Sequence, residues 1–179
     1  MRYPSPTQPL RMIEVDLSAD AIWGGEEIWQ ALSEKAVTAG LSAAPLAALN
    51  ERTITVCVSI RFADNDEVRA LNRDYRQKDR ATNVLSFPML GREELAAFHQ
   101  NDYVTAHETL LGDIALAYET CAAEAAEKGI SLPHHVTHLI IHGTLHLLGY
   151  DHIEEAEGDA MEALEVKALA SLGLPNPYG

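Results

Sequence analysis

One stretch near the carboxyl end, HGTLHLLGYDH at 142–152, constrains this chain more than any other. The apolar residues in and before it recur at helical spacing, and a helix makes about 3.6 residues per turn, so His142 and His146 should share one helix face. Gly149 is placed to end that helix, because glycine enters the left-handed C-terminal conformation at little steric cost. The turn that follows can then bring His152 back toward the other two rings.

Three neutral imidazoles that leave a fourth position open form the ligand set of a catalytic zinc site. We therefore predict one Zn²⁺ per chain, bound by His142, His146 and His152, although other divalent metals can bind the same donors. The spacing HxxxHxxGxxH is that of the metzincin proteases, in which a glutamate after the first histidine is the general base. Gly143 stands at that position here, so the metal ligands are present but the proton acceptor of a peptidase is missing.

Length and composition favour a single domain over residues 1–179, with a loose arm at 1–10. No apolar run reaches the length of a membrane span, and the amino terminus lacks the apolar core of a secretory signal. Cys57 and Cys121 form no CxxC pair and are expected to be reduced. We therefore expect a cytoplasmic protein without a membrane partner. The net charge of −14 does not favour nucleic-acid binding, and DNA is not an expected partner.

Residue periodicity predicts an α+β fold in a single domain. Strands are predicted over residues 13–17, 53–62, 82–88 and 111–118. Helices are predicted over residues 26–39, 64–76, 119–128, 131–148 and 154–172. The first helix should end at Gly40 and carry Ile28 on its core face. Residues 89–109 are expected to form an irregular flap or insert, with a helix at 93–98. The result would be a small mixed sheet of about four strands packed with five or six helices, with the metal site on a central helix and the following turn.

Positive charge concentrates in one segment. Arg69, Arg73 and Arg76 should share a helix face, and Lys78 and Arg80 follow closely. Against the acidic background this cluster is the candidate phosphate-binding surface. The alternative is a solvent-exposed helix face whose arginines pair with nearby aspartates.

Three further residues are candidates for contact with a substrate. Arg61 ends a predicted strand on its more polar face, where a solvated strand end is the alternative. Ser86 lies in the predicted strand 82–88. His138 lies one helical turn before His142, where it could face a substrate, support the metal ligands or have a purely structural role.

The motifs resemble those of the YbeY family of bacterial endoribonucleases and rRNA maturation factors. The histidine stretch is similar to the family's signature. Two earlier blocks are similar to family motifs as well. The first contains Leu71-Asn72, Tyr75-Arg76 and Lys78-Asp79 and leads into Thr82–Pro88. The second is Leu111–Ile114. The resemblance covers residues 54–178.

This resemblance implies a zinc-dependent endoribonuclease, specific for single-stranded RNA, that acts in rRNA maturation at the 3′ end of the small-subunit rRNA and in ribosome quality control. It assigns the zinc ligands to His142, His146 and His152, and the family's functionally important arginine to Arg61. Single-stranded rRNA, the small ribosomal subunit or a ribosomal protein are the implied partners.

The expected chemistry combines a metal, a water and an arginine. Zinc would lower the pKa of a bound water from about 15.7 to about 7. Arg61 could neutralise the phosphate if strand 53–62 ends beside the histidine helix. Attack by the ribose 2′-hydroxyl is the alternative to hydrolysis. Two other functions remain open: a zinc peptidase or amidase that takes its base from Asp151 or Glu108, and a non-catalytic ribosome assembly factor in which the metal joins the helix to the turn.

Overall fold

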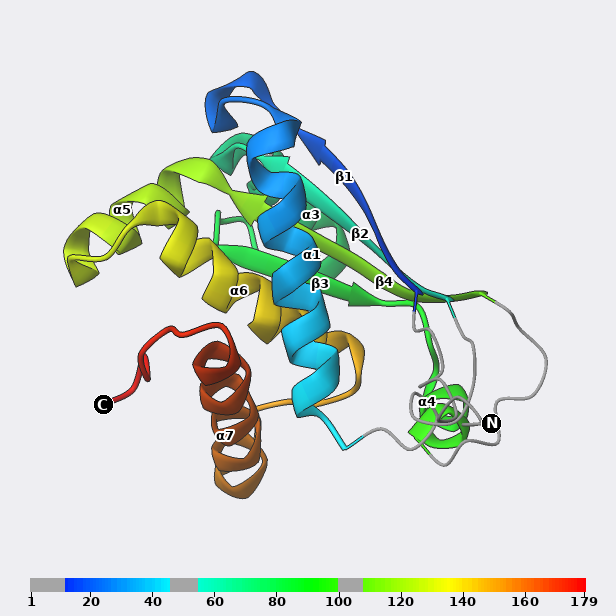
Figure 1. Ribbon diagram of the computed structural model, residues 1–179. Coiled ribbons are helices and arrows are strands. Elements are labelled where there is room, and N and C mark those ends of the chain that lie inside the picture. The colour runs from blue at the N-terminus through cyan, green and yellow to red at the C-terminus, as the bar shows by residue number, and fades with distance from the viewer. Residues whose placement is uncertain (1–11, 46–54, 100–107) are drawn as a thin grey trace, which may run out of the picture.

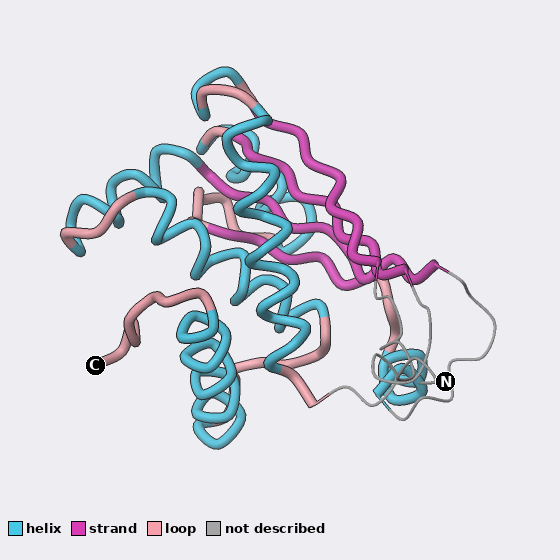
Figure 2. The backbone as a smooth tube through the Cα atoms, viewed as in Figure 1, coloured by secondary structure: helices cyan, strands magenta, loops and turns pink. Residues whose placement is uncertain are grey.

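The computed structural model describes residues 12–45, 55–99 and 108–179. Within these ranges four strands form one sheet in the order β1-β2-β4-β3. They are β1 (Met12–Ala19), β2 (Thr55–Ala63), β4 (Glu108–Ala117) and β3 (Val84–Pro88). β1, β2 and β4 run parallel, and β3 pairs antiparallel with β4 at the edge. The predicted mixed sheet of four strands is confirmed, and Figure 2 shows it as one twisted layer.

The same part of the chain contains six α-helices and one 3-10 helix. They are η1 (Ala21–Trp23), α1 (Glu26–Ala43), α3 (Asn65–Arg76), α4 (Arg92–His99), α5 (Tyr118–Lys128), α6 (Leu132–Leu147) and α7 (Glu155–Ser171). Helices α1 and α6 cover one face of the sheet, α3 lies on the other, and α7 packs outside α1 and α6 (Figure 1). This is the predicted single α+β fold. None of the described helices has the length and apolar character to cross a membrane.

The side chains of β2 alternate between the two faces of the sheet, because successive side chains of a strand point to opposite faces. Ile60 and Phe62 are at most 1% exposed and belong to the main core under α1 and α6. Arg61, between them, points to the other face. A smaller apolar cluster on that face packs under α3 and consists of Ala63, Val68, Leu85, Ala115 and Ala117.

Helix α1 differs from its prediction. It continues past Gly40 to Ala43, so Gly40 does not end it. A Cβ at Gly40 would lie 3.2 Å from the Thr144 side chain, so this glycine permits a close approach of α1 to α6. Ile28, predicted to be in the core, is 62% exposed.

The predicted flap at 89–109 is partly regular. Helix α4 contains the predicted helix 93–98, and Phe98 is fully buried in the main core. Residues 100–107 of that segment lie outside the described residues, as does the amino-terminal arm at 1–10.

Candidate metal centre

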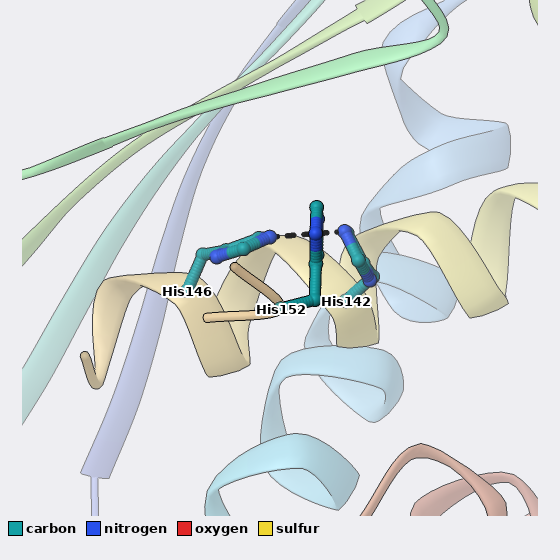
Figure 3. A group of neighbouring side chains, drawn as sticks. All are labelled: His142, His146 and His152. Carbon is teal, nitrogen blue, oxygen red and sulfur yellow. Dashed lines mark hydrogen bonds between the residues drawn. The ribbon is translucent and has the colours of Figure 1, made fainter. Parts of the chain in front are cut away.

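Three histidines converge at the carboxyl end of α6. His142 and His146 lie on the last two turns of that helix, and His152 lies in the loop before α7 (Figure 3). One ring nitrogen from each residue lies within 4.8 Å of the other two. The sequence therefore predicted correctly which three side chains come together.

The end of α6 explains how His152 returns to the helix. Gly149 has a φ of +95°, the left-handed conformation that the sequence predicted for it. The Tyr150 amide donates to the Leu145 carbonyl at 3.1 Å, which is the bond that closes a glycine-ended helix. The Asp151 carboxylate then accepts from the His152 amide at 2.7 Å. Local backbone geometry therefore directs His152 toward the helix face that carries the other two histidines.

Hydrogen bonds at the Nδ1 atoms fix the protonation of two rings. His146 Nδ1 lies 2.8 Å from the Tyr150 carbonyl oxygen, which can only accept, so Nδ1 carries the proton. His142 Nδ1 lies 2.5 Å from Oε1 of Glu165. Burial acts to raise the pKa of Glu165, but hydrogen bonds from His138, His142 and Tyr178 outweigh it and lower the pKa to about 2. Glu165 is therefore an ionised acceptor, and His142 Nδ1 also carries a proton.

This protonation suits both rings to bind a cation. The Nε2 atoms of His142 and His146 then carry lone pairs and face each other at 3.0 Å. Two nitrogens on a tetrahedral zinc lie about 3.3 Å apart when each bond is about 2.0–2.1 Å. Burial and the neighbouring His142 lower the pKa of His146 to about 4, which keeps its ring neutral as a metal ligand must be. The residues present therefore fit a zinc ion.

Glu165 is the site residue that sequence reasoning missed. It belongs to α7, and its side chain is 1% exposed. A signal was present, because Glu165 falls on the buried stripe of that helix between Met161 and Leu169. Charged residues are seldom buried without a partner, so a carboxylate in that stripe indicates a polar site.

His138 and Ser86 lie on the same side of the sheet as α6. His138 Nε2 is 3.5 Å from Glu165 Oε1, so it contacts the carboxylate that holds His142. Ser86 is 7% exposed and pairs with Ile114 across β3 and β4. Ile114 packs against Gly143 of α6, which places the Ser86 side chain on the face that α6 covers.

Arg61 lies on the opposite face. It pairs in register with Ala115, which belongs to the small cluster under α3. Its guanidinium binds Asp20 at 2.6 Å and Glu67 at 2.9 Å, and the Glu67 hydrogen bonds raise its pKa. The Arg61 side chain therefore lies on the sheet face opposite the histidine helix, and its part in phosphate binding stays a prediction.

The arginines of α3 are paired with acceptors in this structure. Arg69 binds Asp79 at 2.8 Å and Arg73 binds Asp74 at 3.0 Å, and all four side chains are more than half exposed. The alternative of an exposed helix face with aspartate partners therefore describes these two. Arg76 instead reaches the edge strand, where it donates to the Ser86 carbonyl at 2.9 Å.

Comparisons with known proteins show the family to which this chain belongs. The profile of the family described as Endoribonuclease YbeY matches residues 26–173. A protein of that name from Rhizorhabdus wittichii is 52% identical over 167 residues, which cover 93% of this chain and 97% of the relative. The chain belongs to the YbeY endoribonuclease family.

One more curated protein and one solved structure are similar to this chain. An Endoribonuclease YbeY from Sphingopyxis alaskensis is 51% identical and covers 93% of this chain and 98% of its own length. A solution structure of TM1509 from Thermotoga maritima covers 90% of this chain and 92% of its own, with 22% identity and a TM-score of 0.49. The YbeY match at 26–173 includes the three histidines and Glu165 and ends before Tyr178.

Proposed function

We propose that this protein is a zinc-dependent endoribonuclease, specific for single-stranded RNA, that matures the 3′ end of small-subunit rRNA and acts in ribosome quality control. The observation that carries the proposal is the convergence of three histidine nitrogens within 4.8 Å, with two rings already in the metal-binding tautomer, in a chain of an endoribonuclease family. We further propose that the protein works in the cytoplasm.

His142, His146 and His152 would hold one zinc ion. Bound zinc supplies a Lewis acid and lowers the pKa of a coordinated water to about 7. The chain's own contribution is orientation, because Glu165 and the Tyr150 carbonyl hold the first two rings at their Nδ1 atoms. His152 is exposed, which leaves its side of the centre open to a substrate.

We propose that RNA reaches the centre across β3. Arg76 lies at this edge strand, with its guanidinium 6.0 Å from the Phe87 ring centroid and bonded to the Ser86 carbonyl. Arg69 and Arg73 are exposed on the α3 side and would hold flanking phosphates after exchanging their aspartate partners for RNA. Ser86 and His138 are the candidate substrate contacts on the α6 side.

For Arg61 we propose a role that does not involve the metal. Its side chain is 34% exposed, and its guanidinium pairs with Asp20 and Glu67, which join the end of β1 and the start of α3 to β2. It would contribute to RNA processing by holding this corner of the α3 side in place, or by contacting RNA there. Zinc binding should therefore be unchanged in Arg61→Ala.

The acidic chain argues for a delivery partner. A net charge of −14 repels RNA at long range, and the basic patch is small. We propose that the small ribosomal subunit, or one of its basic proteins, brings the rRNA to the centre.

The peptidase alternative finds no support at Gly143. A Cβ there would lie 3.0 Å from Ile114 Cδ1, because this position faces the sheet. The place of the missing glutamate is therefore filled by packing. An assembly factor without catalytic activity differs from the proposal in its response to mutation, and the following experiment separates the two.

The test measures zinc content and cleavage of an RNA oligonucleotide, single-stranded or annealed, for wild type, His146→Ala and Arg61→Ala. We expect about one zinc per wild-type chain, preferential cleavage of the single strand, and loss of both zinc and cleavage in His146→Ala. Arg61→Ala should keep its zinc and lose activity. A lowered thermal unfolding temperature would attribute that loss to the fold, and an unchanged one to a lost RNA contact. Zinc-loaded wild type that cleaves no more RNA than His146→Ala would refute the nuclease. A 2′,3′-cyclic phosphate end would identify attack by the ribose hydroxyl.

A further inference from the structure

The carboxyl-terminal tail contacts the metal centre indirectly. Helix α7 ends at Ser171, and Gly173, with a φ of +74°, turns the chain back. The tail then runs beside α6 toward its amino-terminal half (Figure 1). At its end the Tyr178 hydroxyl donates a hydrogen bond to Oε2 of Glu165, the carboxylate that holds His142.

Glu165 depends on this contact because its charge is buried. Its side chain is 1% exposed, and Oε1 faces His142 at 2.5 Å and His138 at 3.5 Å. Tyr178 is the donor at the other oxygen. Burial and the adjacent Glu165 carboxylate raise the pKa of Tyr178, so its hydroxyl keeps its proton and donates. A buried carboxylate that loses a hydrogen-bond donor loses stabilisation of its charge.

A cavity separates the middle of the tail from α6. This cavity has a volume of about 320 Å³ and is lined by His134 and His138 on one side and Pro175 and Pro177 on the other. Tyr178 spans the end of this space, with its ring 5.8 Å from that of His138 in an edge-to-face contact. Leu174 packs against the main core at the start of the tail, and Tyr178 makes the contact near its end.

We propose that Tyr178 is a positioning residue of the metal centre: it fixes Glu165, which in turn fixes the tautomer and ring orientation of His142. This inference rests on the proposed zinc site. Outer partners of metal-bound histidines typically change metal affinity by about 10–100-fold when removed. Coupling is reciprocal, so zinc at His142 should also hold the tail more firmly against α6.

The test compares Tyr178→Phe with wild type. Its matched control is Tyr75→Phe, which removes a hydroxyl from a tyrosine that is 72% exposed on α3. Zinc affinity is measured by competition with a chromophoric chelator. Hydrogen exchange of the peptide 172–179 is followed with and without zinc, and thermal unfolding of the metal-free proteins reports on the fold.

We expect the zinc Kd to rise about tenfold in Tyr178→Phe and to stay unchanged in Tyr75→Phe. Glu165→Gln should weaken zinc binding at least as much as Tyr178→Phe. Zinc should slow exchange of the tail in wild type and have no such effect in Tyr178→Phe. If Tyr178 only supported the fold, neither the zinc Kd nor the effect of zinc on exchange of the tail would change in Tyr178→Phe.

Equal zinc affinity in Tyr178→Phe and wild type would overturn the inference and leave the proposed nuclease intact. Wild type that binds zinc but cleaves no RNA would overturn the nuclease alone, because the role of Tyr178 is measured by binding. Wild type that takes up no zinc would overturn both.

Discussion

Replacing Gly112 with alanine should destabilise the protein more than any comparable change at a glycine on its surface. Gly112 lies in β4 opposite Pro88 of β3 and has a φ of +147°, which favours glycine. A Cβ there would lie 2.2 Å from the Phe87 carbonyl oxygen and 2.8 Å from Cδ2 of Leu147. Leu147 directly follows His146, a proposed metal ligand, so this contact joins the sheet to the histidine helix.

The magnitude follows from two costs. A residue other than glycine at such a φ is strained by about 1–3 kcal/mol, and overpacking adds about 1–3 kcal/mol. The Leu147 methyl can move aside, but the Phe87 carbonyl belongs to the backbone of β3 and cannot move without disturbing the strand. We therefore expect a loss of about 4 kcal/mol in the free energy of unfolding, which for a domain of this size lowers Tm by roughly 8–16 °C.

Gly129→Ala is the matched control. Gly129 also has a positive φ, of +66°, but no atom outside its own neighbours lies within 4 Å of the position of its Cβ. Only the strain of about 1–2 kcal/mol should remain there. Urea and thermal unfolding of both variants are measured with the metal chelated. If Gly112→Ala is no less stable than Gly129→Ala, the close contact with β3 has no energetic consequence and the reasoning is wrong.

Three further predictions concern the histidines, the arginines and Gly143. In the metal-free protein His146 has a pKa of about 4, below its unfolded value of 6.5, so the unfolded state binds more protons between these values. The free energy of unfolding should therefore fall as pH drops below 6.5, and His146 contributes at most about 1.4 kcal/mol per pH unit to this fall. Urea unfolding at several pH values measures it, and the contribution should be missing in His146→Gln. The double charge reversal Arg69→Glu with Arg73→Glu should weaken RNA binding and leave the fold unchanged. The slope of the logarithm of the RNA binding constant against the logarithm of salt concentration should become shallower by about 1.4. An unaltered slope in RNA titrations at several salt concentrations would exclude both residues from the RNA surface. Gly143→Glu should give no peptidase activity and destabilise the fold by more than about 2 kcal/mol, because an unpaired carboxylate would press against Ile114; a stable variant that cleaves peptides would contradict this.

The convergence of the three histidines was predictable because their geometry is local. His142 and His146 are one helical turn apart, and Gly149 ends the helix only three residues later. Glu165 and Tyr178 reach the same centre from α7 and the tail, so their position depends on how helices pack. Sequence spacing does not describe that packing, although the place of Glu165 on a buried stripe gave a usable signal.

Gly40 shows why a local rule can fail. A glycine after an amphipathic stretch normally indicates the end of a helix. Here the glycine lies inside α1, where α1 approaches Thr144 of α6. Sequence alone contains the residue but not the neighbouring helix that requires it to be small.

Arg61 shows the limit of strand patterns. Alternation along β2 correctly placed its side chain on the more polar face, opposite Ile60 and Phe62. It could not say which face the histidine helix would cover. After β2 the chain passes through α3 to β3, which runs antiparallel to β4. The handedness rule concerns connections between parallel strands, so it does not apply to this one.

The division into two sides bears on the proposed preference for single strands. The histidines lie on the α6 side, and Arg69 and Arg73 lie on the α3 side, with the edge strand β3 between them. An RNA that contacts both must bend around that edge, where Arg76 bonds to the Ser86 carbonyl. A single strand can bend in this way because its backbone torsions are free, whereas an A-form duplex keeps its phosphates on a stiff helix. Substrate selection would then follow from the position of β3, without any contact that reads the bases.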